Sequence, residues 1–168
     1  MAKLAKRERF PLGCFQLSRR RQDSIKVPKK RQVTVLEEIF SDDRSIVAIV
    51  VKKDFKKDGL NFLTPEDFPL QLGINSYKKG DQIKAHLHLE KSTIINRFQE
   101  VVYIKNGKAT IILYDSKKAF LKSIELTSGD LIFLASGGHG FDISEDTTIL
   151  EVKQGPYFGK EKDKVTIE

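Results

Sequence analysis

The sequence contains no tryptophan, one cysteine and five prolines among its 168 residues. Because Cys14 is the only cysteine, an intramolecular disulfide is excluded and a reducing, cytoplasmic location is expected. The longest uninterrupted apolar run, Ile46 to Val51, is far shorter than the ~20 residues that a membrane-spanning helix needs. These absences exclude a disulfide scaffold and a helical membrane protein, and the composition excludes a collagen-like or wholly disordered chain.

Basic residues are concentrated at the start of the chain. Residues 1–32 hold 11 Lys and Arg against Glu8 and Asp23, whereas the remaining residues hold 19 basic against 21 acidic side chains. The net charge of +7 therefore belongs to a leader, which we interpret as a flexible, solvated terminus. An arm that contacts an anionic polymer or lipid, and a targeting peptide, are the alternatives. Residues 33–168 are expected to form one domain.

Short strands dominate the rest of the chain. Ile46–Val51 is a bounded, β-branched run typical of a buried strand, while residues 33–40 could form a helix or a strand. Thr64 and Pro65 resemble the start of a single helical turn. Asn106-Gly107 predicts a type I′ hairpin. Further strands are predicted over 71–77, 82–89, 99–105, 108–114, 120–126, 130–135, 140–143 and 147–153. The fold class is all-β, a sandwich or barrel.

The three histidines form the main chemical signal. His86 and His88 lie two residues apart on a predicted strand, so both side chains leave the same face. Glu100 heads an otherwise apolar strand face with Val102 and Ile104, where a carboxylate is costly to bury unless it is paired or ligated. His139 follows a pair of glycines and would approach from the opposite side of the fold. Together these four side chains are candidate metal ligands.

Three segments resemble the cupin family. Gly80-Asp-Gln-Ile-Lys-Ala-His86-Leu-His88 is similar to the first half of the first cupin motif, and Glu100-Val-Val-Tyr-Ile-Lys-Asn-Gly107 to its second half. Gly129-Asp-Leu-Ile-Phe-Leu-Ala135-Ser-Gly137-Gly-His139 resembles the second motif. The stretch also looks like a set of small single-domain cupins of unassigned role, often described as similar to sugar isomerases and associated with surface-polysaccharide synthesis.

The resemblance implies a fold and a site. The fold would be a double-stranded β-helix, the cupin or jelly-roll barrel, over about residues 71–153, with a short irregular N-terminal extension. His86, His88, Glu100 and His139 would bind a divalent metal, and their mixed nitrogen and oxygen donors suit Fe, Mn, Ni or Zn. The ligand would be a small polar molecule. A homodimer is expected, because barrels of this family commonly pair through edge strands.

Three further side chains are candidates for substrate binding. Gln82 and Lys84 share the face of the two histidines, so Lys84 could meet an anionic substrate, although a solvated edge lysine is the simpler role. Arg97 lies in the extension after His88, where it could close over the barrel mouth or face water.

Three functions remain open. The first is a metal-binding protein, or a metal-dependent isomerase- or oxygenase-like enzyme, acting on a sugar derivative. The second is a metal-free cupin that binds a carbohydrate or nucleotide-sugar, with His86 or His139 as a base or a hydrogen-bond partner. The third is a module whose basic arm meets nucleic acid. It ranks last, because the sequence shows no helix-turn-helix pattern and no interleaved aromatics.

Overall fold

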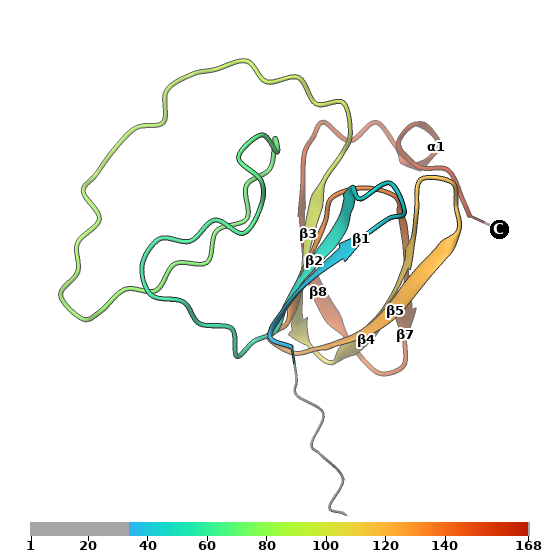
Figure 1. Ribbon diagram of the computed structural model, residues 1–168, viewed down its shortest axis with the longest axis horizontal. Helices are drawn as coiled ribbons and strands as arrows, with labels where there is room; N and C mark the ends of the chain where they lie inside the picture. The colour runs from blue at the N-terminus through green and yellow to red at the C-terminus, as the bar shows by residue number, and fades with distance from the viewer. Residues whose placement is uncertain (1–33, 168) are drawn as a thin grey trace, which may run out of the picture. The chain divides into compact units, whose positions relative to one another are not determined.

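A computed structural model describes residues 34–167 of the chain, and the predicted leader over residues 1–32 lies outside the described residues (Figure 1). The all-β class is confirmed for this part of the protein. No helix between residues 34 and 167 is long and apolar enough to cross a membrane. The elements are β1 (Leu36–Phe40), β2 (Ile46–Val51), β3 (Glu100–Asn106), β4 (Lys108–Tyr114), β5 (Phe120–Thr127), β6 (Leu131–Leu134), β7 (Gly138–Ile143), β8 (Thr148–Lys153) and the single-turn helix α1 (Lys160–Asp163).

The strands form two antiparallel sheets. The larger sheet has five strands in the order β1-β2-β6-β3-β8, and the smaller has three in the order β5-β4-β7. The ambiguous stretch before residue 40 forms the strand β1, which pairs with β2. Among the described residues, β7 pairs only with β4 and β8 only with β3, so each leaves one backbone edge without a strand partner. That open edge on β7 is important for the site.

A hydrophobic core lies between the two sheets. Alternation along β4 buries Ala109, Ile111 and Leu113 completely, because every second side chain of a strand faces the same side. The five-stranded sheet contributes inward side chains at the same period, including Val102 and Ile104. Removing this apolar area from water stabilises the pairing by about 25 cal/mol per Å².

A second cluster covers the outer face of the five-stranded sheet. Ile49 and Phe133 point away from the first core and pack against side chains from residues 55–74, including Phe68, whose ring centroid lies 6.1 Å from that of Phe133. The strand β2 is therefore covered on both faces. This explains why its sequence is continuously apolar rather than alternating.

Two predicted strands are absent from the structure. Residues 71–77 instead fold back on the preceding loop through isolated bridges, Gly73 with Phe62 and Ser76 with Gly59. Residues 82–89 have no strand partner among the described residues and are exposed throughout. In Figure 1 the green to yellow-green segment that carries them extends away from the strands. An amphipathic pattern alone does not supply the neighbouring strand that such a segment needs.

The predicted hairpin at Asn106-Gly107 is wrong. The strands β3 and β4 do not pair with each other, since β3 belongs to the larger sheet and β4 to the smaller one. Of these two residues, Gly107 has a positive φ, at 82°, and Asn106 does not. A type I′ turn needs positive values at both central residues. The dipeptide is therefore a corner that passes the chain between sheets. Gly107 is required there because a Cβ would collide with the carbonyl oxygen of Asp146.

The predicted helix start at Thr64 is a turn without a helix. The amide of Phe68 donates to the carbonyl of Pro65 at 3.1 Å, and the chain does not continue helically. Thr64 does not cap this turn. Its Oγ1 accepts a hydrogen bond from the amide of Leu72 at 3.1 Å and donates to Gln71 Oε1 at 3.1 Å, so it joins two sides of a loop.

Candidate functional site

Glu100 occupies the inner face of the larger sheet at the start of β3. It lies on the same face as Val102 and Ile104, as the alternation in the sequence predicted, and is 8% exposed. Its backbone neighbours across the sheet are Leu134 on β6 and Lys153 on β8. A carboxylate therefore stands at the end of an apolar wall, where an unpaired charge would be strongly unfavourable.

His139 is placed opposite Glu100 by the smaller sheet. It pairs in register with Leu113 of β4, which is fully buried, so the imidazole belongs to the inner face of that sheet. Its Nε2 donates a hydrogen bond to Glu100 Oε1 at 2.7 Å. Phe141, two residues further along β7, lies on the same face with its ring centroid 5.6 Å from that of His139. Two side chains distant in sequence thus meet between the sheets.

The charge of Glu100 is favoured by its surroundings. Burial raises the pKa of the Glu100 carboxyl, but the hydrogen bond from His139 and the charges of His139, Lys164 and Lys153 outweigh burial, so the net pKa lies below the ordinary value. The carboxylate is consequently ionised at neutral pH. It can act as a hydrogen-bond acceptor or as an oxygen ligand there.

A cavity of about 630 Å³ opens around the Glu100–His139 pair. The barrel strands supply one part of its wall, and the segment after β8 supplies the other. Figure 1 shows α1 at the end of the strands where β3 begins. The polar and charged lining side chains are Arg97, Gln99, Glu100, Tyr114, Ser136, His139, Lys153, Gln154, Lys160, Asp163, Lys164 and Thr166.

His86 and His88 do not reach this cavity in the structure. Both lie in the exposed segment, with ring centroids 5.2 Å apart, and His86 Nδ1 lies 2.9 Å from the carbonyl oxygen of Lys84. Within residues 34–167 no group of three or more histidine, cysteine or acidic side chains is placed to hold a metal ion. The structure therefore brings together two of the four candidate ligands, Glu100 and His139, and leaves the other two apart.

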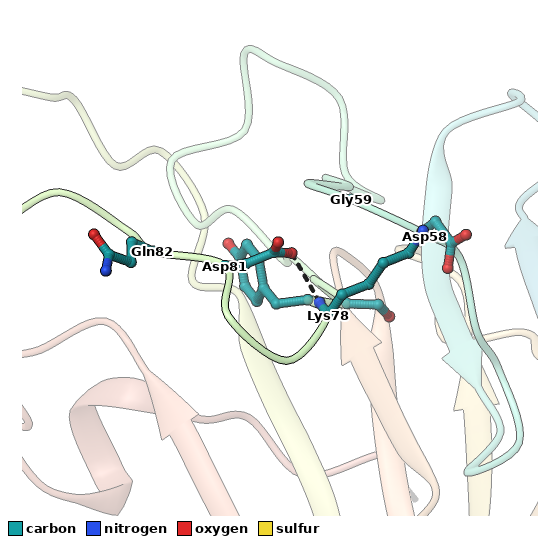
Figure 2. A pocket seen from close by; sticks show the side chains of 7 residues that line it. Asp58, Gly59, Lys78, Asp81 and Gln82 are labelled. Carbon is teal, nitrogen blue, oxygen red and sulfur yellow. Dashed lines mark hydrogen bonds between the residues drawn. The ribbon is translucent and has the colours of Figure 1, made fainter.

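The candidate substrate residues divide in the same way. Arg97 lines the cavity beside Glu100, whereas Lys84 is exposed in the same segment as the two histidines. Gln82 lines a different and shallower hollow, which Figure 2 shows at the base of that segment. There the Asp81 carboxylate accepts a hydrogen bond from the amide of Lys78 at 2.8 Å. This hollow is formed by exposed turn residues and contains no histidine.

Several cavity residues were not predicted from the sequence. The sequence predicts Lys153 at the end of the strand over 147–153, a turn at Gln154-Gly155-Pro156 and a charged tail after it, and it gives none of them a role in the site. Lys164 and Ile167 nevertheless line the cavity. The apolar side chain of Ile167 within this charged tail is the local sign that the segment packs against something.

Comparison with known proteins identifies no relative: no family model, no curated protein and no solved structure matches the chain.

Proposed function

We propose that this protein is a cupin-type barrel whose functional centre is the cavity around Glu100 and His139. There it would bind a divalent metal and a small polar molecule, a sugar derivative being the class that the cupin resemblance implies. The observation that carries the proposal is the 2.7 Å contact between Glu100 and His139. The acid of the first cupin-like motif and the histidine of the second are separated along the chain, yet they share one point inside the fold.

Completion of the site requires the exposed segment to join the sheet. In residues 82–89 the odd-numbered side chains are apolar, and Leu87 and Leu89 are 92% and 90% exposed. Burying each leucine would contribute roughly 1.5–3 kcal/mol. The even-numbered side chains include His86 and His88. A strand formed here would therefore be amphipathic, with both imidazoles on one face.

The open edge of β7 is the proposed partner of this strand. Residues 77–98 span about 70 Å when extended, which is ample for the segment to reach the neighbouring sheet. Pairing residues 82–89 with β7 would give the smaller sheet a fourth strand and complete a double-stranded β-helix. It would also set His86 and His88 on a strand adjacent to His139, so that three imidazoles and one carboxylate face the cavity.

The chemistry follows from this donor set. A bound divalent metal would polarise a substrate oxygen or activate a water molecule. Glu100, already ionised, would supply the oxygen ligand and the three imidazoles the nitrogen ligands. The apolar wall formed by Val102 and Ile104 would limit water around the carboxylate, which strengthens its interactions.

A metal-free function is the second candidate, and the direct Glu100–His139 hydrogen bond favours it. In the neutral form of His139 that donates from Nε2 to the Glu100 carboxylate, Nδ1 would be unprotonated. His139 would then serve as a general base toward a carbohydrate or nucleotide-sugar, oriented by Glu100. This arrangement needs neither His86 nor His88.

Metal content separates the two candidates. Full-length protein purified without a histidine tag is analysed by inductively coupled plasma mass spectrometry, and the double variant His86→Ala/His88→Ala is compared with the control Lys79→Ala/Lys91→Ala from the same segment. We expect near-stoichiometric metal in the parent and control. The histidine variant should lose the metal while keeping its circular dichroism spectrum. Metal retained in that variant would contradict the proposed ligand set, and a metal-free parent would support the His139 base.

A further inference from the structure

The cavity around Glu100 and His139 carries an excess of positive charge. Four basic side chains line it from three separate segments, namely Arg97 before β3, Lys153 on β8, and Lys160 and Lys164 in the C-terminal segment. The acidic lining residues are Glu100 and Asp163. With four basic and two acidic side chains, the lining of the cavity carries a net positive charge. Such a concave surface concentrates anions.

Gln154 lines the cavity and has a buried side-chain donor. Its Oε1 accepts a hydrogen bond from the amide of Gln99 at 2.7 Å, which sets the orientation of the side-chain amide. Its Nε2 is buried and has no hydrogen-bond partner among the described residues. A buried donor without an acceptor is unfavourable, which marks Gln154 as an unsatisfied polar group beside the cavity.

Lys153 is positioned on the barrel itself. It pairs in register with Glu100, and its Nζ lies 3.3 Å from Glu151 Oε1 and 5.1 Å from the centroid of the Tyr157 ring. The contacts with Glu151 and Tyr157 hold the ammonium beside the cavity. A partly exposed ion pair of this kind contributes little, so an anionic ligand in the cavity can compete with Glu151 for Lys153.

Lys164 is brought to the cavity by the packing of the C-terminal segment. The side chain of Ile167 lies against Gly138, and its Cδ1 occupies the space that a Cβ at position 138 would need. Gly138 immediately precedes His139, so this contact anchors the segment next to the imidazole. Lys164 therefore lines the same cavity as Glu100 and His139.

We infer that the cavity takes a small molecule bearing an oxyanion, either a phosphate or a carboxylate, whose charge is met by Lys153 and Lys164. This inference rests on the proposed use of the cavity as a ligand site, and it adds the chemical class of the ligand. It does not depend on the metal. The C-terminal segment thereby becomes part of the binding site rather than a solvated tail.

The test follows the His139 ring in the full chain. Metal-free protein with isotope-labelled histidine is titrated with glucose 6-phosphate, glucuronate and uncharged glucose, and the His139 signal is assigned with His139→Gln. We expect a saturable shift of that signal with at least one charged sugar and none with glucose. A shift with only the phosphate or only the carboxylate identifies which oxyanion the cavity takes.

Variants connect the shift to the named lysines. Lys164→Gln should weaken the apparent Kd by about tenfold, the loss expected for one charge-assisted hydrogen bond, and Lys153→Gln should act in the same direction. The control is Lys105→Gln, an exposed residue of β3 outside the cavity lining. Equal shifts with glucose, no saturable shift with either charged sugar, or an unchanged Kd in Lys164→Gln would overturn the inference.

The same titration is repeated after metal loading, which keeps the two proposals separate. Anion binding by protein that takes up no metal on loading would support this inference while contradicting the metal site. Bound metal without any anion-dependent shift would contradict this inference alone.

Discussion

Asp130 offers the sharpest test of how the two sheets are held together. It lies in the turn between β5 and β6 and is 2% exposed. Its Oδ1 accepts a hydrogen bond from the amide of Lys53 at 2.9 Å, and its Oδ2 accepts from the amide of Thr127 at 2.9 Å and from Lys52 Nζ at 3.0 Å. Because Lys52 and Lys53 follow β2 and Thr127 ends β5, one carboxylate connects both sheets.

The cost of replacing Asp130 with alanine follows from these contacts. Two backbone amides lose their acceptor in a partly buried place, at about 1–3 kcal/mol each. The ion pair contributes less, since the Lys52 side chain is 23% exposed and is screened by water, and its loss adds about 1 kcal/mol at most. Relief from burying the carboxylate offsets part of the sum. We therefore expect Asp130→Ala to lower the free energy of unfolding by about 3 kcal/mol at pH 7.

Urea unfolding measures this change. With an m value of roughly 1.5–2 kcal/mol/M, a loss of about 3 kcal/mol moves the midpoint down by about 1.5–2 M. Asp142→Ala, which removes an exposed aspartate of β7, is the matched control and should stay within about 0.5 kcal/mol of the parent. An Asp130→Ala midpoint within error of that control would refute the contact analysis.

The pH dependence gives a second check on Asp130. Burial raises the pKa of its carboxyl, but the hydrogen bonds from Thr127, Lys53 and Lys52 lower it more, so the folded pKa lies below the ordinary 3.8. The stabilisation is therefore present above pH 3.8 and is lost as the pH falls through the folded pKa. The difference between the parent and Asp130→Ala should shrink in strong acid, and a constant difference would contradict this reasoning.

Three further substitutions test the corner at Gly107, the packing of the C-terminal segment against Gly138 and the charge of Glu100. Gly107→Ala should cost about 2–4 kcal/mol in urea unfolding, because its φ of 82° and the nearby Asp146 carbonyl leave no room for a Cβ; an unchanged midpoint would contradict this. Gly138→Ala should displace Ile167 and speed trypsin cleavage in the C-terminal segment, and an unaltered cleavage rate would disprove that packing. The lowered pKa of Glu100 makes stability fall as the pH drops below about 4.5, so Glu100→Gln should flatten that loss in acid unfolding; a slope equal to the parent's would argue against it.

Strands whose signal is local could be predicted from the sequence. Ile46–Val51 and Lys108–Tyr114 were predicted with the bounds that the structure shows. The first is a bounded β-branched run, the second places Ala109, Ile111 and Leu113 at every other position, and both patterns are typical of strands. The same alternation placed Glu100 on the inner face of β3.

Features that depend on distant pairing could not be predicted in this way. The pattern of residues 82–89 describes an amphipathic strand, but it contains nothing about which sheet edge is available to it. Asn106-Gly107 looks like a hairpin because a turn signal does not reveal whether the next strand returns to the same sheet. In the structure that strand enters the other sheet.

The sequence by itself determined the all-β class, most strand positions and the two motifs that contain Glu100 and His139. Those properties depend on neighbours along the chain. Only the tertiary structure decided that these two side chains share a hydrogen bond, that Gln154 is left with a buried donor, and that Lys164 lines the same cavity. Such contacts join residues far apart in sequence, and their geometry follows from sheet register and packing rather than from local periodicity.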